Sequence, residues 1–557
     1  MPHASPAVVL DRVTFTWPDG TVALDSVSGA FSDVRTGLIG RNGAGKSTLL
    51  GLIAGTRVPA SGTVFRSGTV DVMPQRVPED TRVAALLGVD TSLDAVRAIA
   101  SGDVDQRHFD AVGDDWDVEA RAQAALAEAG LPADALDRRV RALSGGEAVL
   151  AALVGVRLRG APIALLDEPT NNLDRDARAR VYELVRSWRG TLIVVSHDTA
   201  LLEQMDETAE LYGSALTTFG GPYSAWRAAH EEEQAAARQA ESAARQQVRR
   251  EKRDRIHQDQ VLATRTAVGN KAYAEKRVPK IIMGARKRSA QVSAGRLRIE
   301  ARDKEMEARA VLDAAERRVR DDESVHIDLP DPGVAAGRRI ATIGDGERSW
   351  VIQGPERVAL IGPNGAGKTT LLERLVSSGS VSSEHDDVHN SASTAAAGGA
   401  GGPEGPPRRS PVHATAHTDR VGYLSQRIDR LDEEAAPLEN LRRAAPGVGD
   451  VELRNRLARF LLRGATVLRP VSALSGGERF RLALACLVMA EPAPQLLVLD
   501  EPTNNLDLDT VDQLVAALSA FRGAVVVVSH DDGFLGRIDP DLVLELREGV
   551  LAEVASG

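Results

Sequence analysis

The chain has 557 residues, of which 43% are hydrophobic and 26% charged, as in an ordinary globular protein, and it is long enough for two to four domains. The single cysteine, Cys486, excludes an internal disulfide framework, and its apolar surroundings in the sequence predict a buried structural thiol. No stretch approaches the roughly 18 consecutive apolar residues of a membrane-spanning helix, and the N-terminus lacks the pattern of a signal peptide.

The net charge of −11 is unevenly distributed along the chain. Between residues 245 and 298 there are sixteen Lys or Arg and four Asp or Glu, a local charge of +12 that leaves −23 for the remainder. A basic segment within an acidic protein predicts a polyanionic partner that contacts this segment alone.

The first part of the chain predicts strands followed by a phosphate-binding loop. Apolar residues alternate between residues 7 and 35, and a Pro-Asp-Gly turn interrupts them, which indicates antiparallel strands. A short apolar strand then leads into GRNGAGKS at residues 40–47, and a helix is expected after it. This matches the G-x-x-x-x-G-K-[ST] phosphate-binding motif in its required context, and the motif returns as GPNGAGKT at residues 362–369.

In such a loop, backbone N–H groups surround the phosphates, the lysine reaches the terminal phosphates and the hydroxyl reaches Mg²⁺. Two copies of the motif on one chain argue against a chance match. The candidate nucleotide-binding residues are Gly40, Asn42, Gly43, Ala44, Gly45, Lys46, Ser47 and Thr48 in the first copy, and Gly362, Asn364, Gly365, Ala366, Gly367, Lys368, Thr369 and Thr370 in the second; Ser47 and Thr369 are also candidate metal ligands.

The nonapeptide LDEPTNNLD also occurs twice, at residues 166–174 and 499–507. Each copy follows an apolar run that predicts a buried strand of a parallel sheet, so its two acids lie at the carboxyl end of that strand. Adjacent carboxylates, Asp167 with Glu168 and Asp500 with Glu501, can divide the work there: one would hold Mg²⁺ and the other would polarise a water. A turn with two solvated acids is the alternative, but identity over nine residues argues against it.

Two more motifs are duplicated. LSGGE at residues 143–147 and 474–478 predicts helix N-termini capped by serine, and these are either plain helix starts or second phosphate-binding sites. The candidate residues there are Ser144, Gly145, Gly146, Ser475, Gly476 and Gly477. Ser-His-Asp occurs at residues 196–198 and 529–531, with each histidine, His197 or His530, 29 residues after the glutamate of its own half.

This order of motifs resembles the ATP-binding-cassette ATPases over residues 1–220 and 333–557. The resemblance implies that Glu168 and Glu501 are catalytic and that His197 and His530 sense the γ-phosphate. It further implies that Mg²⁺ and the attacking water are contacted by the glutamines of MPQR and LSQR, Gln75 and Gln426.

The resemblance also assigns an adenine-stacking role to Trp17, whereas the second half has no clear equivalent because Trp350 is poorly placed. In this family each ATP is shared between the phosphate-binding loop of one half and the LSGGE segment of the other.

The expected fold class is α/β, with two tandem ATPase domains at residues 1–221 and 326–557 joined by a basic helical-hairpin linker at 222–325. A Ser-, Ala-, Gly- and Pro-rich stretch at 377–418 predicts a disordered insertion. The first domain carries about 20 extra residues near 90–116, counted from the spacing of its motifs.

The linker sequence predicts two long helices at 225–264 and 289–322, with a turn at 268–284 that contains Gly, Asn and Pro. A coiled-coil spacer would explain the helices but not the basic, partly apolar tip, which indicates contact with nucleic acid. The candidate RNA-binding residues are Arg249, Arg250, Lys252, Arg253, Lys271, Lys276, Arg277, Lys280, Arg286, Lys287 and Arg288.

With this linker, the chain resembles the ABC-F class of translation factors, and its tip is most similar to the antibiotic-resistance branch. The resemblance implies a cytoplasmic monomer whose cassettes close on ATP, and whose linker enters the ribosomal E site and reaches toward P-site tRNA and the peptidyl-transferase centre of 23S rRNA. The alternatives are a housekeeping elongation factor and the ATPase subunit of a membrane exporter, for which a basic hairpin is ill suited.

Overall fold

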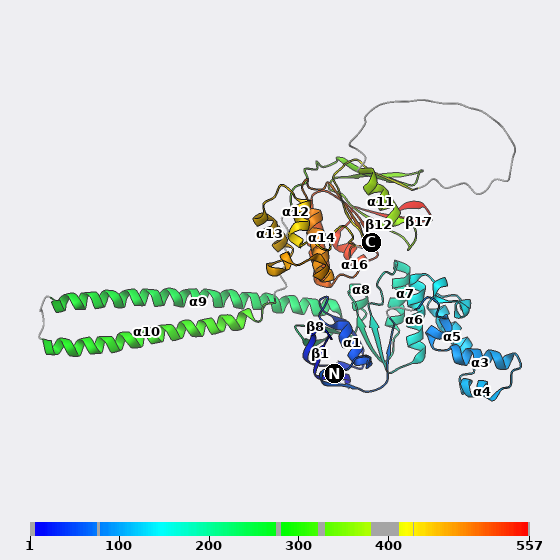
Figure 1. The fold of residues 1–557 in the computed structure, drawn as a ribbon, viewed down its shortest axis with the longest axis horizontal. Helices are drawn as coiled ribbons and strands as arrows, with labels where there is room; N and C mark the ends of the chain where they lie inside the picture. Colours follow the sequence, from blue (N-terminus) through cyan, green and yellow to red (C-terminus); the bar gives the residue numbers. More distant parts are fainter. Residues whose placement is uncertain are drawn as a thin grey trace, which may run out of the picture. The chain divides into compact units, whose positions relative to one another are not determined.

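The computed structural model describes residues 6–74, 78–274, 280–320, 329–379, 412–426 and 428–554. Contacts divide the chain into two units, one formed by Met1–Tyr223 and Ser324–Gly557, the other by Ser224–Glu323. In the following, the first cassette is the part of the first unit before Ser224, the second cassette is the part after Glu323, and the linker is the second unit (Figure 1).

The first cassette contains nine strands within its described residues: β1 Pro6–Thr16, β2 Val22–Ser32, β3 Arg35–Ile39, β4 Ser61–Arg66, β5 Val70–Val72, β6 Ile163–Asp167, β7 Thr191–Val195, β8 Glu207–Tyr212 and β9 Ala215–Gly220. An antiparallel sheet of order β2-β1-β4 confirms the strands predicted in the first part of the chain. The main sheet has the order β5-β6-β7-β3-β8-β9 and is parallel except for β9.

The helices of this cassette are α1 Lys46–Ala54, α2 Val83–Leu87, α3 Asp90–Ala100, α4 Gln106–Val112, α5 Val118–Glu128, α6 Gly145–Arg159, α7 Arg175–Arg186 and α8 Thr199–Leu202, with 3-10 turns at Ala133–Asp137 and Val140–Ala142. The stretch near 90–116, where the extra residues are predicted, holds α3 and α4, which lie side by side (Figure 1).

Strand β6 illustrates why an uninterrupted apolar run forms a buried parallel strand. Ile163 and Leu165 pack into a core shared with β1 and α1, whereas Ala164 and Leu166 face a second core formed with α6 and α7. A strand buried on both faces cannot alternate apolar and polar residues. Its first polar residue, Asp167, is therefore also the one at its carboxyl end.

The second cassette repeats this architecture. Its strands are β10 Arg339–Gly344, β11 Ser349–Gln353, β12 Arg357–Ile361, β13 His413–Ala416, β14 Val421–Leu424, β15 Leu496–Asp500, β16 Ala524–Val528, β17 Leu542–Arg547 and β18 Val550–Val554. They form sheets of order β11-β10-β13 and β14-β15-β16-β12-β17-β18. The helices are α11 Lys368–Gly379, α12 Pro437–Ala444, α13 Asp450–Arg459, α14 Gly476–Val488, α15 Leu508–Ala520 and α16 Asp532–Ile538, with 3-10 turns at Gly464–Leu468 and Val471–Ala473.

The insertion predicted at 377–418 is too wide at both ends. Residues 377–379 belong to α11, and His413–Ala416 forms β13, which pairs with β10. Low-complexity composition concealed β13, because its apolar residues, Ala414 and Ala416, are too small to give a clear hydrophobic alternation. Residues 380–411 lie outside the described part of the chain.

The linker consists of two long helices, α9 Tyr223–Ala274 and α10 Lys280–Glu316, which run side by side (Figure 1). Both extend further toward the tip than predicted: the expected turn at 268–284 was wrong, since Gly269 and Asn270 lie within α9 and Gly284 within α10. The second helix also ends at Glu316 rather than at residue 322. Residues 275–279 lie outside the described part.

The contacts between the two helices show that the helices run antiparallel. Arg255 Nε donates to Glu305 Oε2 at 2.6 Å, and Arg298 lies 3.3 Å from Asp259. Small buried residues recur every seven positions, at Ala237 and Ala244 on α9 and at Ala301, Ala308 and Ala315 on α10. This spacing is the heptad of a coiled coil, and alanine allows close approach of the helix axes. No helix among the described residues is long and apolar enough to cross a lipid bilayer.

Candidate nucleotide sites

The order of the main sheet brings the duplicated motifs together. In the first cassette the phosphate-binding loop follows β3, the Asp-Glu pair follows β6, and His197 follows β7, which lies between them. The carboxyl ends of these neighbouring parallel strands meet at one edge, where open α/β sheets bind ligands. We define site one as the first loop with Glu168 and His197, and site two as the second loop with Glu501 and His530.

Each phosphate-binding loop begins with a glycine that no other residue could replace without strain. Gly40 has a φ of 149°, and a Cβ there would lie 2.5 Å from the carbonyl oxygen of Leu211. Gly362 has a φ of 142°, and its Cβ would lie 2.2 Å from the carbonyl oxygen of Leu546. The loop backbone can therefore turn tightly against the sheet only at glycine.

The loop lysines are buried beneath these turns. Lys46 Nζ donates to the carbonyl of Gly40 at 2.5 Å, and Lys368 Nζ donates to that of Gly362 at 2.7 Å. Burial lowers the pKa of both lysines, although nearby carboxylates, first among them Glu168 and Glu501, oppose the shift. Both ammonium groups therefore point into the loop where phosphate oxygens would bind.

The candidate catalytic glutamates occupy an unusual backbone conformation. Glu168 and Glu501 have φ angles of 51° and 47°, in the left-handed region that non-glycine residues rarely adopt. Each is held there by its N–H, which donates at 2.9 Å to the last residue of the neighbouring strand, Val195 or Val528. Strain of this kind persists at functional sites. Burial raises the pKa of Glu168 to about 8 and that of Glu501 to about 7.

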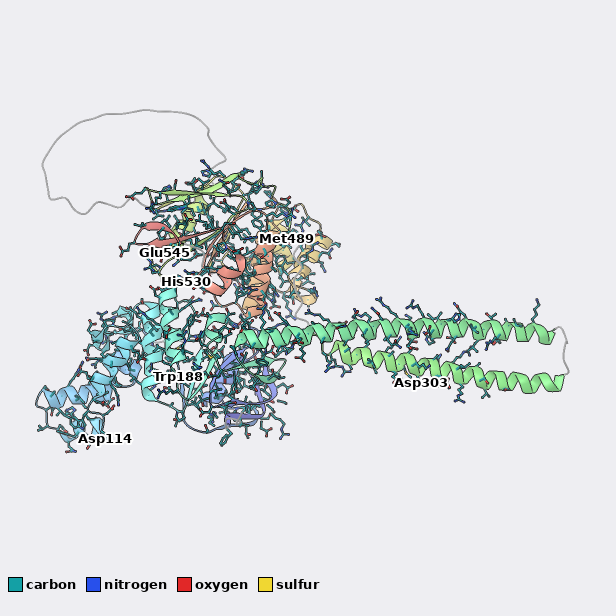
Figure 2. All side chains as sticks on the ribbon, turned by 180° about the vertical axis from the view of Figure 1, so that it is seen from behind. Asp114, Trp188, Asp303, Met489, His530 and Glu545 are labelled. Carbon is teal, nitrogen blue, oxygen red and sulfur yellow. The ribbon has the colours of Figure 1, made fainter. Side chains whose placement is uncertain are left out.

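Each glutamate faces the histidine of its own half. His197 Nε2 lies 3.3 Å from Glu168 Oε1, and His530 Nε2, on the residue labelled in Figure 2, lies 3.3 Å from Glu501 Oε1. Burial, reinforced by the nearby lysine, lowers the pKa of both histidines to about 3, so the imidazoles are neutral. Within the described residues, the Nδ1 atoms of both rings are buried without a hydrogen-bond partner.

The residues predicted to hold Mg²⁺ fit a hard divalent cation because all of them offer oxygen. In site two the Thr369 hydroxyl donates to Asp500 Oδ2 at 2.9 Å, so the two oxygens are close enough to bind the same cation. Burial raises the pKa of Asp500 because it disfavours the charged carboxylate, and a bound cation would offset this effect. Gln426 lines the same cavity. In site one, Asp167 is buried and Ser47 exposed, and Gln75 lies outside the described residues.

Site two is a cavity of about 490 Å³ with walls from both cassettes. The second cassette contributes most of the predicted residues, and the first cassette contributes Asn172 and Leu173. Its lining consists of Asn172, Leu173, Asn364, Gly365, Gly367, Lys368, Thr369, Thr370, Gln426, Asp500, Glu501, Asn504, Val528 and His530. A volume of this size is within the range of small-molecule sites.

The contacts between the cassettes in the structure differ from the pairing of phosphate-binding loop and LSGGE segment that the family resemblance implies. Several of them are made by the tails of the two LDEPTNNLD segments, residues 171–174 and 504–507, which we call D-loops. The N–H of Asn42 donates to Asp507 Oδ2 at 2.8 Å, and the N–H of Asn364 donates to Asp174 Oδ2 at 3.3 Å. Each D-loop thus contacts the phosphate-binding loop of the opposite half.

The LSGGE segments begin α6 and α14 as predicted, and each helix has a complete capping box. The Ser144 hydroxyl accepts from the N–H of Glu147 at 3.2 Å, and Ser475 accepts from Glu478 at 3.3 Å. Among the described residues that line the site-two cavity, none comes from 144–146. The structure therefore brings the opposite D-loop, but not the opposite LSGGE segment, to this cavity.

Trp17 lies at the turn between β1 and β2, 37% exposed, with the guanidinium of Arg57 4.3 Å from its ring centre. The corresponding turn of the second cassette, between β10 and β11, begins with Asp345, whose carboxylate accepts from the N–H of Arg348 at 2.8 Å. Trp350 lies in β11 and packs against the core. The two sites thus differ at the expected adenine position.

The basic candidates on the linker are exposed wherever their side chains are described. Arg249, Arg250, Lys252, Arg253 and Lys271 are all solvent-exposed on α9, and side chains project along the described length of both helices (Figure 2). Lys280, Arg286, Lys287 and Arg288 belong to α10, but their side chains lie outside the description, as do Lys276 and Arg277 altogether.

Comparison with known proteins assigns the family. Residues 28–171 and 347–504 each match the family described as ABC transporter. The chain is 31% identical to the tylosin resistance ATP-binding protein TlrC of Streptomyces fradiae, with 96% of both chains covered. It is 28% identical to mouse ATP-binding cassette sub-family F member 3, covering 91% of this chain and 67% of that protein. The chain belongs to the ABC-F group of ATP-binding cassette proteins.

As an ABC-F protein, the chain is an ATPase with two ATP-binding cassettes. A solved structure of the archaeal ribosome recycling factor aABCE1, in complex with the ribosomal stalk protein aP1, has the same fold, with a TM-score of 0.52 at 16% identity over 97% of this chain and 89% of that one. The α/β fold with two tandem cassettes and a helical segment between them is confirmed.

Proposed function

We propose that this ABC-F protein is an ATP-dependent ribosome-binding factor that protects the ribosome from bound antibiotics. The observation that carries the proposal is the similarity to a tylosin resistance protein over 96% of both chains, which includes the linker. The exposed basic residues of α9 add a surface suited to RNA phosphates. In the proposal, the linker enters the E site, contacts 23S rRNA and reaches toward P-site tRNA and the peptidyl-transferase centre.

The proposed chemistry follows from the site geometry. Lys46 and Lys368 hold the terminal phosphates, and Glu168 and Glu501 orient the attacking water and accept its proton, since their raised pKa values suit a base near neutral pH. Asp167 or Asp500 with the loop hydroxyl and Gln75 or Gln426 would hold Mg²⁺, which when bound neutralises charge on the phosphate oxygens.

The neutral histidines act as hydrogen-bond partners of the terminal phosphate in this scheme. Within the described residues, the Nδ1 atom of each ring has no hydrogen-bond partner. One ring nitrogen of each histidine can therefore form a new hydrogen bond when ATP binds. Closure of the cassettes would then bring Ser144, Gly145 and Gly146 to site two and Ser475, Gly476 and Gly477 to site one. Closure occurs within one chain, so the protein acts as a monomer, and with the ribosome as its partner it works in the cytoplasm.

A housekeeping role in elongation is the second candidate, since mouse sub-family F member 3 also matches most of this chain. The decisive test compares drug susceptibility of strains with and without the gene, across macrolides, lincosamides, streptogramins, pleuromutilins and phenicols. Protection predicts a raised inhibitory concentration for at least one class, and the increase should disappear in the Glu168→Gln/Glu501→Gln variant. Unchanged susceptibility to every class, together with ribosome co-sedimentation, would support the housekeeping role. Recovery in membranes rather than with ribosomes would support an exporter subunit.

A further inference from the structure

Arg178, in the first turn of α7, is a buried cation with two partners. It is 8% exposed, its Nε donates to the carbonyl oxygen of Leu173 at 3.2 Å, and its Nη1 lies 3.7 Å from Asp198 Oδ2. A buried guanidinium is costly to desolvate and is tolerated where its partners are fixed. Nothing in the motifs of the sequence singles out this residue.

The two partners of Arg178 belong to different nucleotide sites. Leu173 lines the site-two cavity together with Glu501 and His530. Its neighbours on the same D-loop hold the site-two phosphate-binding loop, because Asn172 O accepts from Asn364 Nδ2 at 3.1 Å and Asp174 accepts from the Asn364 N–H.

Asp198, in contrast, directly follows His197 of site one and caps α8 through the N–H of Leu201 at 3.1 Å. One side chain therefore joins the histidine-bearing loop of site one, residues 196–198, to the wall of site two.

The second cassette does not repeat this link. Arg178 is four residues after Asp174, and the residue four positions after Asp507 is Val511, an apolar side chain that is 6% exposed. Valine can fill neither role, so among the described residues the position equivalent to Arg178 does not join the histidine loop of site two to the D-loop facing site one. Tyr182, which donates to Asp198 Oδ2 at 2.7 Å, likewise corresponds to Val515.

The charges around Arg178 are consistent with a role at the junction of the two cassettes. Asp198, which is buried, and Asp531, which is half-buried, are equivalent carboxylates from the two halves. Burial raises the pKa of Asp531, Asp198 raises it further, and the N–H of Phe534 and the charge of Arg178 oppose the shift. Helices α8 and α16 approach closely there, since a Cβ on Gly533 would lie 2.8 Å from Thr199 Oγ1.

We propose that Arg178 is a positioning residue that couples the histidine loop of site one to the D-loop wall of site two, and that the two ATP sites are unequal because only the first cassette has it. Removal of Arg178 leaves Asp198 held by Tyr182 and by its helix cap, whereas the carbonyl of Leu173 loses a charged donor. Site two therefore depends on Arg178 more than site one does. The inference rests on the proposed catalytic roles of Glu168 and Glu501.

The test measures ATP turnover one site at a time in the full-length protein. Glu168→Gln leaves site two as the reporter, and Glu501→Gln leaves site one. Arg178→Met should lower kcat at least tenfold in the Glu168→Gln protein and less than threefold in the Glu501→Gln protein. Arg178→Lys, which keeps the charge but not the guanidinium geometry, should lower site-two kcat by only two- to threefold. Tyr182→Phe, a matched change on the other partner of Asp198, should leave site-two kcat within twofold.

Equal losses of kcat in both single-site proteins would overturn the proposal, since they would mean that Arg178 only supports the fold. Unchanged site-two turnover would overturn it as well. If Arg178→Met does not fold, Arg178→Lys is the deciding variant. A folded lysine variant whose site-two kcat falls two- to threefold, with site-one kcat unaffected, supports the coupling. Unchanged site-two kcat in this variant rejects it. A separate control is the Glu168→Gln/Glu501→Gln double variant without a change at Arg178. If this protein still turned over ATP, the catalytic assignment of the two glutamates would itself be rejected.

Discussion

The backbone N–H of Asn42, in the first phosphate-binding loop, donates to the carboxylate of Asp507 in the second cassette at 2.8 Å. Burial raises the pKa of Asp507, but the N–H groups of Asn42 and Thr510 outweigh this effect, and the net pKa is below its ordinary value. The carboxylate is therefore ionised when it binds the loop. A group of the second half thus holds the loop that would bind ATP in the first half.

This hydrogen bond predicts that Asp507→Asn weakens site one selectively. The substitution keeps one side-chain oxygen for the N-cap of α15 but places the amide NH2 opposite the N–H of Asn42, so this hydrogen bond is lost, at a cost of about 1 kcal/mol or roughly fivefold. We expect kcat/KM for ATP to fall by about this factor in the Glu501→Gln protein, where only site one turns over. Asp174→Asn is the matched control and should leave site one unaffected; a decrease as large as that of Asp507→Asn would contradict the assignment.

The sequence was sufficient to predict the strands, loops and caps that carry the duplicated motifs, although not β13, because each of these depends on residues close together in the chain. Glycine and lysine at fixed spacing set the phosphate-binding loop, and serine with glutamate three residues later set the cap of α6. The hydrogen bond between Asn42 and Asp507 could not be predicted in this way. It depends on how two halves dock, and no local pattern encodes that.

The linker shows that a glycine in the sequence does not reliably predict the end of a helix. Glycine in a helix costs about 1 kcal/mol relative to alanine, so Gly269 and Gly284 predict helix ends when each is considered alone. In the structure both lie within helices. Packing between two long antiparallel helices, with pairs such as Arg255 and Glu305, stabilises each turn more than one glycine destabilises it.

The catalytic assignment makes a prediction for the double variant Glu168→Gln/Glu501→Gln. Each substitution keeps the size of the side chain but removes the group that accepts the proton of water. We expect ATP to bind with near-normal affinity and turnover to fall about 100-fold or more. Equilibrium binding of a labelled ATP and steady-state phosphate release measure the two effects. Turnover at the wild-type rate would show that neither glutamate is catalytic.

The ends of the segment at 380–411 predict that it can be shortened. Ser378 Oγ accepts from the N–H of Ala416 at 2.8 Å, and a Cβ on Gly379 would lie 2.8 Å from the carbonyl of Thr418. The chain is therefore held together on both sides of the segment by interactions that do not involve it. Replacing residues 383–408 with a short Gly-Ser linker should leave the melting temperature within about 2 °C, since loop length contributes little to stability, and ATPase activity within about twofold.

A wider deletion provides the control for this experiment. Extending it through Ala416 removes β13 and its pairing with β10, and this variant should lose stability or fail to fold. If the shorter deletion also fails to fold, residues 383–408 have a structural role that their composition does not indicate.

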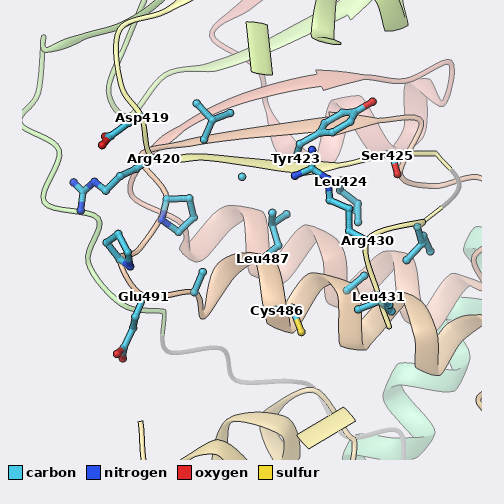
Figure 3. Close-up of a pocket in the computed structure, with 17 residues that line it drawn as sticks. Asp419, Arg420, Tyr423, Leu424, Ser425, Arg430, Leu431, Cys486, Leu487 and Glu491 are labelled. Carbon is cyan, nitrogen blue, oxygen red and sulfur yellow. The ribbon is translucent and has the colours of Figure 1, made fainter. Parts of the chain in front are cut away.

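We predict that the thiol of Cys486 is accessible to reagents but reacts slowly. It is only partly buried, contrary to the sequence-based expectation, and it lies on the wall of a cavity of about 430 Å³ in the second cassette, together with Leu487, Tyr423 and Leu431 (Figure 3). These apolar surroundings raise the pKa of the thiol to about 12. The reactive thiolate is therefore about a thousandfold scarcer at neutral pH than in an unfolded chain.

We expect iodoacetamide to label native Cys486 slowly at pH 7.5 and progressively faster up to about pH 11, without the plateau near pH 9 that an ordinary thiol shows. The chain unfolded in guanidinium should react at the ordinary rate. The same shift has a consequence for stability: a pKa raised on folding stabilises the native state below about pH 9, and this contribution declines as the pH rises toward 12. Fast labelling at pH 7.5 would contradict the assignment.

The linker predicts that its stem and its tip have separable functions. The exposed stem cations Arg249, Arg250, Lys252 and Arg253 can each release a counterion on binding an RNA phosphate. Replacing any one of them with a neutral residue should therefore weaken ribosome binding and reduce the slope of log affinity against log salt by about one. Arg255 is a matched control on the same helix, because it pairs with Glu305 and should contribute less to the slope.

The tip sequence at 278–283, VPKIIM, contains apolar residues that cannot contribute counterion release. Replacing Ile281, Ile282 and Met283 with alanine should therefore leave the salt slope and ribosome binding of the Glu168→Gln/Glu501→Gln protein unchanged, yet abolish antibiotic protection, if these side chains pack near the drug or the tRNA end. Ribosome co-sedimentation at several salt concentrations and inhibitory concentrations in cells measure the two properties. An equal decrease of binding in stem and tip variants would make the tip an anchor, and unchanged binding in both would make the linker a spacer and reject the ribosome proposal.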